Sequence, residues 1–127
     1  MKLKGCIADM KNRVFINFSN HPSDKWEIRQ IEAAKVYGEI IDLPFPEVDE
    51  TKGESYIANL ADEYVEKILN YEPEAVLCQG EFTLAFAVIT ALKEQKVDVL
   101  AACSRRVAEE HEGKKISVFS FERFRRY

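Results

Sequence analysis

Long apolar runs, glycine and proline are all scarce in this chain of 127 residues. No apolar run reaches the roughly 18 residues that a helix needs to cross a bilayer, and the first residues lack the apolar stretch of a signal peptide. Five glycines and four prolines make only 9 such residues, and no internal repeat is visible, which excludes fibrous, linker-like and solenoid proteins. We therefore expect no membrane segment and a cytoplasmic location.

Cysteine is equally scarce. Cys6, Cys78 and Cys103 are odd in number and form no C-x-x-C pair, which argues against a disulfide framework and against a zinc site. Two of the three lie inside apolar runs, and we expect these two to be small buried thiols. The sequence also lacks a Walker motif, a complete G-x-G-x-x-G and an acidic triplet for magnesium, so NTP hydrolysis and dinucleotide redox chemistry are disfavoured. We predict neither a cofactor nor a metal.

Charge is distributed unevenly along the chain, although the net charge is only −4. Residues 1–103 carry 11 basic and 18 acidic side chains, a net charge of −7, whereas residues 104–127 carry 7 basic and 4 acidic, a net charge of +3. The acidic majority repels phosphate at long range, so we expect no non-specific binding to DNA. A local anion site near the C-terminal end is still compatible with these charges.

Short β-like runs alternate with longer helical patterns, which is typical of a parallel sheet with crossover helices. The predicted strands are 14–18, 39–43, 75–79 and 97–103, and the predicted helices are about 24–37, 56–69 and 82–94. A turn at Glu112-Gly113-Lys114 indicates a C-terminal β-hairpin, and a short edge strand is expected at 2–7. The chain length suits one domain over residues 1–127, which we predict to be a Rossmann-like three-layer α/β sandwich with a mostly parallel sheet.

The predicted helix at 82–94 has almost no face suited to water. In its run FTLAFAVITAL only Thr83 and Thr90 are polar. A helix that is apolar all round must be covered on more than one side. Either it is a central crossover helix, or a homodimer forms with its two-fold axis beside it, and we favour the homodimer.

Polar residues follow three of the predicted strands. Because ligands bind beyond the carboxyl ends of parallel strands, we expect these three loops to share one edge of the sheet. They are Ser19-Asn20-His21 after the first strand, Gln79-Gly80-Glu81 after the third and Ser104-Arg105-Arg106 after the fourth.

Together these loops predict a pocket for a phosphorylated ligand. The first two lead into helices, whose free amide groups attract an anion, and the third supplies two guanidinium groups. Gly80 would let a ligand approach the backbone closely. The predicted ligand-binding residues are Asn20, Gln79, Gly80, Glu81, Thr83, Ser104 and Arg106.

Ser19 and His21 would point the same way if the backbone stays extended through residues 19–21. A hydroxyl and an imidazole at one spot can orient a ligand or transfer a proton, so the catalytic candidates are Ser19, His21 and Arg105. Glu81 would repel a phosphate unless it faces away, caps the next helix or acts as a base, and we favour the structural role.

The closing residues 121–127 interleave aromatic and basic side chains. One interpretation is an edge strand that is protected by charge. The other is an arm that stacks a base and neutralises a phosphate.

Short motifs in this chain resemble those of a known group of proteins. They are FSNH after the first strand, QGEFT after the third, a Ser-Arg pair after the fourth and a closing RFRRY. In this order they resemble the small CRISPR-associated accessory proteins related to CARF domains and ring nucleases. The resemblance spans about residues 14–127.

This resemblance implies a CARF-like homodimer that binds cyclic oligoadenylate, the second messenger of type III CRISPR immunity, across its two-fold axis. It also implies that such a protein can cleave the ring without a metal, by attack of a ribose 2′-hydroxyl on the adjacent phosphate. Ser19 and His21 would then line the site, and Arg105 or Arg106 would stabilise the phosphate. Two alternatives stay open: a non-catalytic nucleotide-sensing dimer, and an unrelated α/β protein that binds a phosphorylated metabolite.

Overall fold

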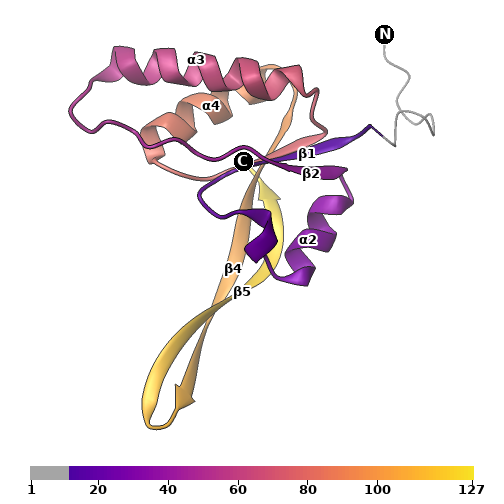
Figure 1. The fold of residues 1–127 in the computed structure, drawn as a ribbon, viewed down its shortest axis with the longest axis vertical. Helices are drawn as coiled ribbons and strands as arrows, with labels where there is room; N and C mark the ends of the chain where they lie inside the picture. Colours follow the sequence, from indigo (N-terminus) through magenta and orange to yellow (C-terminus); the bar gives the residue numbers. More distant parts are fainter. Residues whose placement is uncertain (1–11) are drawn as a thin grey trace.

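A computed structural model describes residues 12–127 of the chain, which form a five-stranded sheet with helices on both faces (Figure 1). In chain order the elements are β1 (Val14–Phe18), the 3₁₀ helix η1 (Ser23–Lys25), α2 (Ile28–Lys35), β2 (Glu39–Asp42), α3 (Glu54–Asn70), β3 (Ala75–Cys78), α4 (Phe82–Glu94), β4 (Asp98–His111) and β5 (Lys114–Arg126). The predicted edge strand at 2–7 and Cys6 lie outside the described residues.

The sheet has the strand order β2-β1-β3-β4-β5. The pairs β1·β2, β1·β3 and β3·β4 are parallel, and only β4·β5 is antiparallel. This confirms the predicted α/β class, the mostly parallel sheet and the C-terminal hairpin. None of the described helices is long and apolar enough to cross a membrane.

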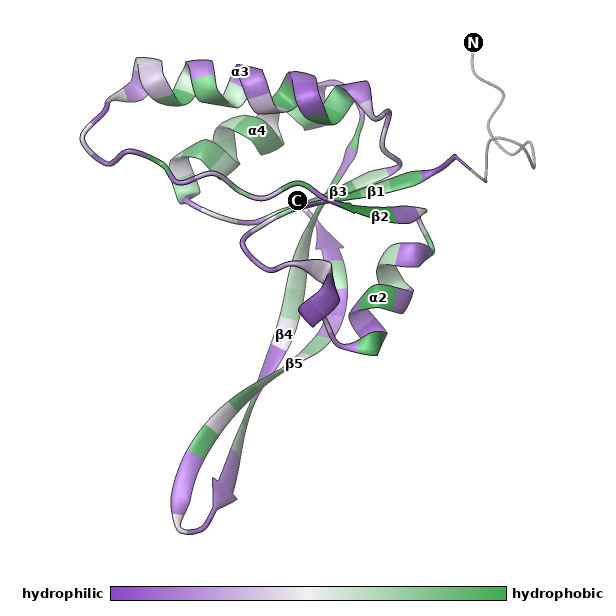
Figure 2. Ribbon diagram, viewed as in Figure 1, coloured by the Kyte–Doolittle hydropathy of each residue, from purple (hydrophilic) through white to green (hydrophobic). Residues whose placement is uncertain are grey.

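Each face of the sheet carries its own hydrophobic core. On one face α3 and α4 pack against the strands through a cluster that includes Ile16, Ile68 and Val88, and Figure 2 shows the apolar side of α3 turned toward α4 and the sheet. On the other face a smaller cluster forms around Phe15 and Ala34, where α2 packs on the sheet. Alternate residues of β1 serve the two cores because successive strand side chains point to opposite faces.

The predicted helix over about 24–37 is wrong in its extent. The chain forms η1 and α2 instead, and Trp26 and Glu27 between them have extended backbone. Neither η1 nor α2 has a side-chain hydrogen bond at its N-cap. The reason is tertiary: the Trp26 indole Nε1 donates to the His21 carbonyl at 3.0 Å, and the Glu27 carboxylate accepts the Phe121 amide of β5 at 2.7 Å.

The fourth predicted strand, 97–103, is much longer in the structure. β4 continues to His111 because β5 pairs with it from Leu100↔Arg126 to His111↔Lys114. The two residues of the turn, Glu112 and Gly113, have φ values of 52° and 79°, which is the conformation of a tight hairpin turn. Residues 104–120 therefore form a two-stranded arm that extends away from the sheet (Figure 1).

Cys78 lies fully buried in β3, as expected, whereas Cys103 in β4 is partly exposed. Burial raises the pKa of the Cys78 thiol from 9.0 to about 12. Burial also raises the pKa of the Tyr127 phenol, whose hydroxyl donates to the Cys78 carbonyl at 2.7 Å. Both groups are therefore held neutral in the folded state at a pH where the unfolded chain ionises.

We predict that the folded state loses stability as the pH rises from about 9 toward about 12. Over this range the unfolded Cys78 thiol loses its proton and the folded one keeps it, so the free energy of unfolding falls by up to ~1.4 kcal/mol per pH unit. Urea denaturation at several pH values measures this slope. Cys78→Ala should flatten it and Cys103→Ala should not; equal slopes in the two variants would contradict the prediction.

Candidate functional site

The sheet changes the direction of its connections between β1 and β3. β1 leads to α2 on one face and β3 leads to α4 on the other, while the two strands pair side by side from Phe15↔Ala75 to Phe18↔Cys78. In open α/β sheets the crevice outside the carboxyl ends of two such strands is the usual ligand site. Ser19 and Gln79 are the residues that follow these strands.

Phe45 fills this crevice. The chain after β2 stays against β1, where the Phe45 amide donates to the Ser19 carbonyl at 3.2 Å. The Phe45 ring lies 4.7 Å from the Phe18 ring, centroid to centroid, and only 7% of the residue is exposed. A Cβ atom on Gly80 would lie 2.6 Å from the Phe45 ring. Gly80 is therefore required by a packed side chain of this protein, and not by a ligand as the sequence suggested.

Ser19 is part of a buried polar network. Its hydroxyl donates to Asn17 Oδ1 at 2.7 Å, and Asn17 Nδ2 donates to Asp42 Oδ1 at 2.8 Å and to the His21 carbonyl at 2.9 Å. The backbone bends at residues 19–21, so the extended conformation expected there is wrong. Ser19 is buried, whereas Asn20 and His21 are exposed, and the Ser19 hydroxyl serves the fold.

The two predicted anion sites are already occupied by carboxylates of the chain itself. Asp42 accepts the Ser23 amide at 3.2 Å, at the start of η1. Glu81 is the N-cap of α4: its Oε1 accepts the Leu84 amide at 2.8 Å and the Thr83 hydroxyl at 2.6 Å. The Thr83 hydroxyl, followed by the Leu84 amide, lowers the pKa of Glu81. This confirms the favoured structural role of Glu81 and removes these donors from a ligand.

The Gln79 side chain extends the contact between β3 and β4 beyond their last backbone pair. The backbone pairing of β3 with β4 ends at Leu77↔Leu100, and the Gln79 side-chain Oε1 then accepts the Ala102 amide at 2.9 Å. Within the described part of the chain, its Nε2 group makes no hydrogen bond and remains a donor.

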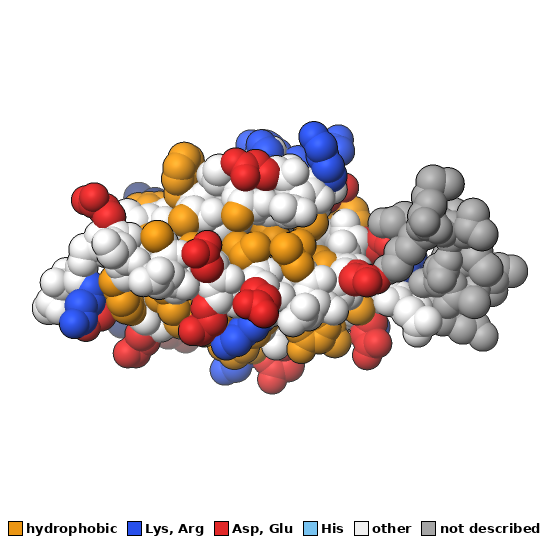
Figure 3. Space-filling model, turned by 90° about the horizontal axis from the view of Figure 1, so that it is seen from above, with side chains coloured by type: hydrophobic (Ala, Val, Ile, Leu, Met, Phe, Trp, Pro, Cys, Tyr) orange, Lys and Arg blue, Asp and Glu red, His pale blue; other side chains and the backbone are white. Residues whose placement is uncertain are grey.

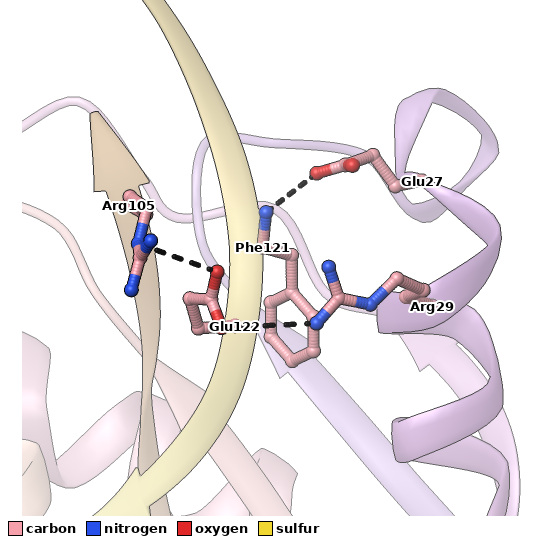
Figure 4. Close-up of polar contacts among 5 residues, drawn as sticks. All are labelled: Glu27, Arg29, Arg105, Phe121 and Glu122. Atoms are coloured by element: carbon pink, nitrogen blue, oxygen red, sulfur yellow. Dashed lines mark hydrogen bonds and ion pairs between the residues drawn. The ribbon is translucent and has the colours of Figure 1, made fainter. Parts of the chain in front are cut away.

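Ser104, Arg105 and Arg106 do not form a loop, which corrects the sequence prediction. They belong to β4, and its pairing with β5 continues through them after a register shift between Cys103 and Ser104. Arg105 forms an ion pair with Glu122 at 3.8 Å, Glu122 also pairs with Arg29, and Figure 4 shows this group between the two strands and α2. Arg106 donates to the Ser117 hydroxyl at 2.9 Å.

A cleft of about 1090 Å³ lies against α4, on the other side of Gly80 from Phe45. Its walls are the exposed side of α4, the start of α3 and the Gln79-Gly80 turn, and Lys52, Lys93 and Tyr127 lie on its border. Two phenylalanines one turn apart, Phe82 and Phe86, line it with 89% and 73% of their surface exposed. Figure 3, which views the molecule from above, shows apolar side chains among acidic ones on the face that carries α3.

The structure thus divides the predicted site into three parts. Gln79, Gly80 and Thr83 line the cleft beside α4. Ser19 and Asn20 line a small pocket of about 150 Å³ that also contains Phe45. Arg105 and Arg106 lie in the arm. Within residues 12–127, no group of three or more His, Cys, Asp and Glu side chains is arranged to hold a metal ion.

Sequence reasoning missed the residues that dominate the cleft. Phe82 and Phe86 were seen only as part of an apolar helix, and their spacing of four residues was the available signal for a shared exposed face. Phe45 stands between Pro44 and Pro46, a pattern that indicated only the end of a strand. Its contact with Gly80 joins segments 35 residues apart in the sequence, as the two residue numbers show.

The fold and the cleft define a mostly parallel α/β protein with an apolar site beside its α4 helix. The sequence profile of the Uncharacterized protein MJ1673 family matches residues 13–125, from β1 through nearly all of β5, so the chain belongs to this family. A search of curated proteins gave no match to the sequence.

We predict that Gly80→Ala destabilises the fold by about 1–3 kcal/mol, because its methyl group would overlap the Phe45 ring. Gly53→Ala is the control, since a Cβ there meets no atom within 4 Å. Thermal and urea denaturation measure both variants. Adding Phe45→Leu to Gly80→Ala should recover part of the loss; an equal effect of the two glycine substitutions would show that the contact with Phe45 is not limiting.

Proposed function

We propose that this protein binds a cyclic oligoadenylate as a homodimer, with the cleft beside α4 as the nucleotide site. The observation that carries the proposal is the pair of exposed phenylalanines in that cleft, Phe82 and Phe86. Aromatic rings that face solvent from a cleft are platforms on which bases stack. In this proposal the domain is a Rossmann-like, CARF-like sandwich in a cytoplasmic setting, as predicted from the sequence.

Two lysines in the lining of the cleft suit phosphate, and the lining also includes one side-chain carboxylate, that of Glu54. Lys52 lies at the border formed by the start of α3, and Lys93 lies at the far end of α4, where its Nζ donates to the Tyr127 carbonyl at 2.9 Å. The Nε2 amide of Gln79 supplies a further donor. A nucleotide suits this cleft better than a free anion does, because the walls are mainly apolar. Its bases would stack on the two phenylalanines, and its phosphates would lie between the lysines.

The same geometry favours binding over cleavage. A ring nuclease has to hold the 2′-hydroxyl, the phosphate and the charge-stabilising group in one place. Here the Ser19 hydroxyl donates to Asn17, His21 is exposed, and Arg105 pairs with Glu122. A nucleotide-sensing dimer is therefore the form of the proposal that we favour, and metal-independent ring cleavage is the second candidate.

We predict that Phe82→Ala and Phe86→Ala each weaken the binding of cyclic tetra- or hexa-adenylate by about tenfold, since base–aromatic stacking contributes ~1–3 kcal/mol per base. Isothermal titration calorimetry measures the affinity. Ile28→Ala on α2 is the control, because Ile28 is also exposed but lies far from the cleft in the fold. If neither ring binds the wild-type protein, the proposal is wrong and a phosphorylated metabolite becomes the leading alternative.

A second prediction separates the sensor from the enzyme. Incubation of the protein with each ring in EDTA, followed by chromatography, should return intact ligand. Saturating ligand at ~100 times its dissociation constant should still stabilise the protein by ~2.7 kcal/mol. Linear products would instead establish cleavage, and His21→Ala would then have to slow the reaction more than it weakens binding.

A further inference from the structure

The arm leaves one edge of β4 without a partner. On the sheet side, the parallel pairing of β4 ends at Leu100, and the Gln79 side chain reaches only as far as Ala102. Residues 104–111 pair with β5 alone within the described chain, and all of them are exposed. A two-stranded ribbon with nothing on its faces or edges is marginally stable in water, so this arm is a surface that gains from a partner.

Two hydrogen bonds show which residues direct their backbone amides outward along the edges of the arm. The Ala102 amide points toward β3, where it meets Gln79, so the alternation along β4 turns the amides of Arg106 and Ala108 to the same open side. Correspondingly, the Phe121 amide of β5 points outward and is taken by Glu27. The outer edge of β5 is therefore partly blocked by a carboxylate, whereas the β4 edge is open.

The sequence of β4 in the arm is complementary to itself in charge. It reads Arg-Arg-Val-Ala-Glu-Glu from Arg105 to Glu110, basic at the base of the arm and acidic toward its tip. Antiparallel pairing of two copies would bring the basic end of each against the acidic end of the other. Opposite charges in facing positions stabilise strand pairs, and like charges destabilise them.

Symmetry selects the register. In an antiparallel pair, the side chains of two facing residues point to the same face of the sheet. When a two-fold axis relates two identical strands, one residue must therefore face its own copy in the partner. Centring on Arg106 would oppose two arginines. Centring on Ala108 would oppose Arg106 and the partner's Glu110, but it would also place Val107 opposite the partner's Glu109 and so separate the two valines. Centring on Val107 places Arg105 opposite the partner's Glu109, and by symmetry it places Glu109 opposite the partner's Arg105.

The same register also joins two of the exposed apolar residues of the arm, Val107 and Val118. Val118 of β5 faces Val107, and both are about 40% exposed, at 39% and 38%. Pairing at Val107 creates one apolar row across four strands, from Val118 through the two copies of Val107 to the partner's Val118. The ion pairs lie on the same face, because residues two apart on a strand share a face.

We propose that two copies of this chain form a dimer through the open β4 edges of their arms, paired antiparallel around Val107. The contact stands on the geometry of the arm, and it supplies the homodimer that the proposed function requires while leaving Phe82 and Phe86 free for a ligand. In this register the partner's turn, at its Glu112 and Gly113, comes next to Gln79 at the rim of the cleft.

A matched pair of proline variants tests the edge. Ala108→Pro removes an outward amide of β4, and Ser117→Pro removes the outward amide of the residue that faces it on β5. Proline is tolerated on a free strand edge but blocks pairing there. Analytical ultracentrifugation without ligand should find a wild-type dimer, at least about a tenfold weaker dimer for Ala108→Pro, and an unchanged dimer for Ser117→Pro.

Charge reversal tests the register independently of folding. Arg105→Glu opposes two acidic side chains and should weaken the dimer, and Arg105→Glu combined with Glu109→Arg should restore it. A monomeric wild-type protein, or a dimer that neither Ala108→Pro nor Arg105→Glu weakens, would overturn the proposal. These measurements contain no nucleotide, so they test the dimer contact alone. Calorimetry on the wild-type protein tests nucleotide binding separately, and the two proposals can therefore fail independently.

Discussion

The contact between Phe45 and Gly80 controls what the carboxyl edge of this sheet can do. It brings the segment after β2 across the ends of β1 and β3, and the absence of a side chain at residue 80 allows the ring to lie there. The crevice where an α/β sheet usually binds its ligand is consequently part of the hydrophobic core. Open space of ligand size is found on the far side of Gly80, against α4.

Carboxylates of the chain also bind backbone donors at three places, two helix starts and one strand edge. Asp42 accepts the first amide of η1, Glu81 accepts the Leu84 amide at the start of α4, and Glu27 accepts an outward amide of β5. Each satisfies a donor that would otherwise attract an anion or another strand. Among residues 12–127, the groups that remain exposed include the aromatic side of α4, the Gln79 Nε2 amide and the β4 edge of the arm.

Most of the fold and part of the candidate site could be predicted from the sequence. The strand at 14–18 and the helix at 82–94 have the predicted bounds, because their apolar patterns are continuous and end at turn residues. The N-cap role of Glu81 followed from its place before a helix. Ser104, Arg105 and Arg106 were misassigned to a loop because their exposed, charged pattern resembles a loop when the pairing strand is not known.

The sequence by itself determined the alternation of strands and helices, the hairpin turn and the uneven charge, since each depends on residues close together in the chain. Only the tertiary structure decided which polar groups remain free. That outcome depends on contacts between distant residues: Phe45 against Gly80, Asp42 on Ser23, and β5 along β4. A backbone donor binds whichever acceptor the fold brings within reach, and local sequence does not specify that acceptor.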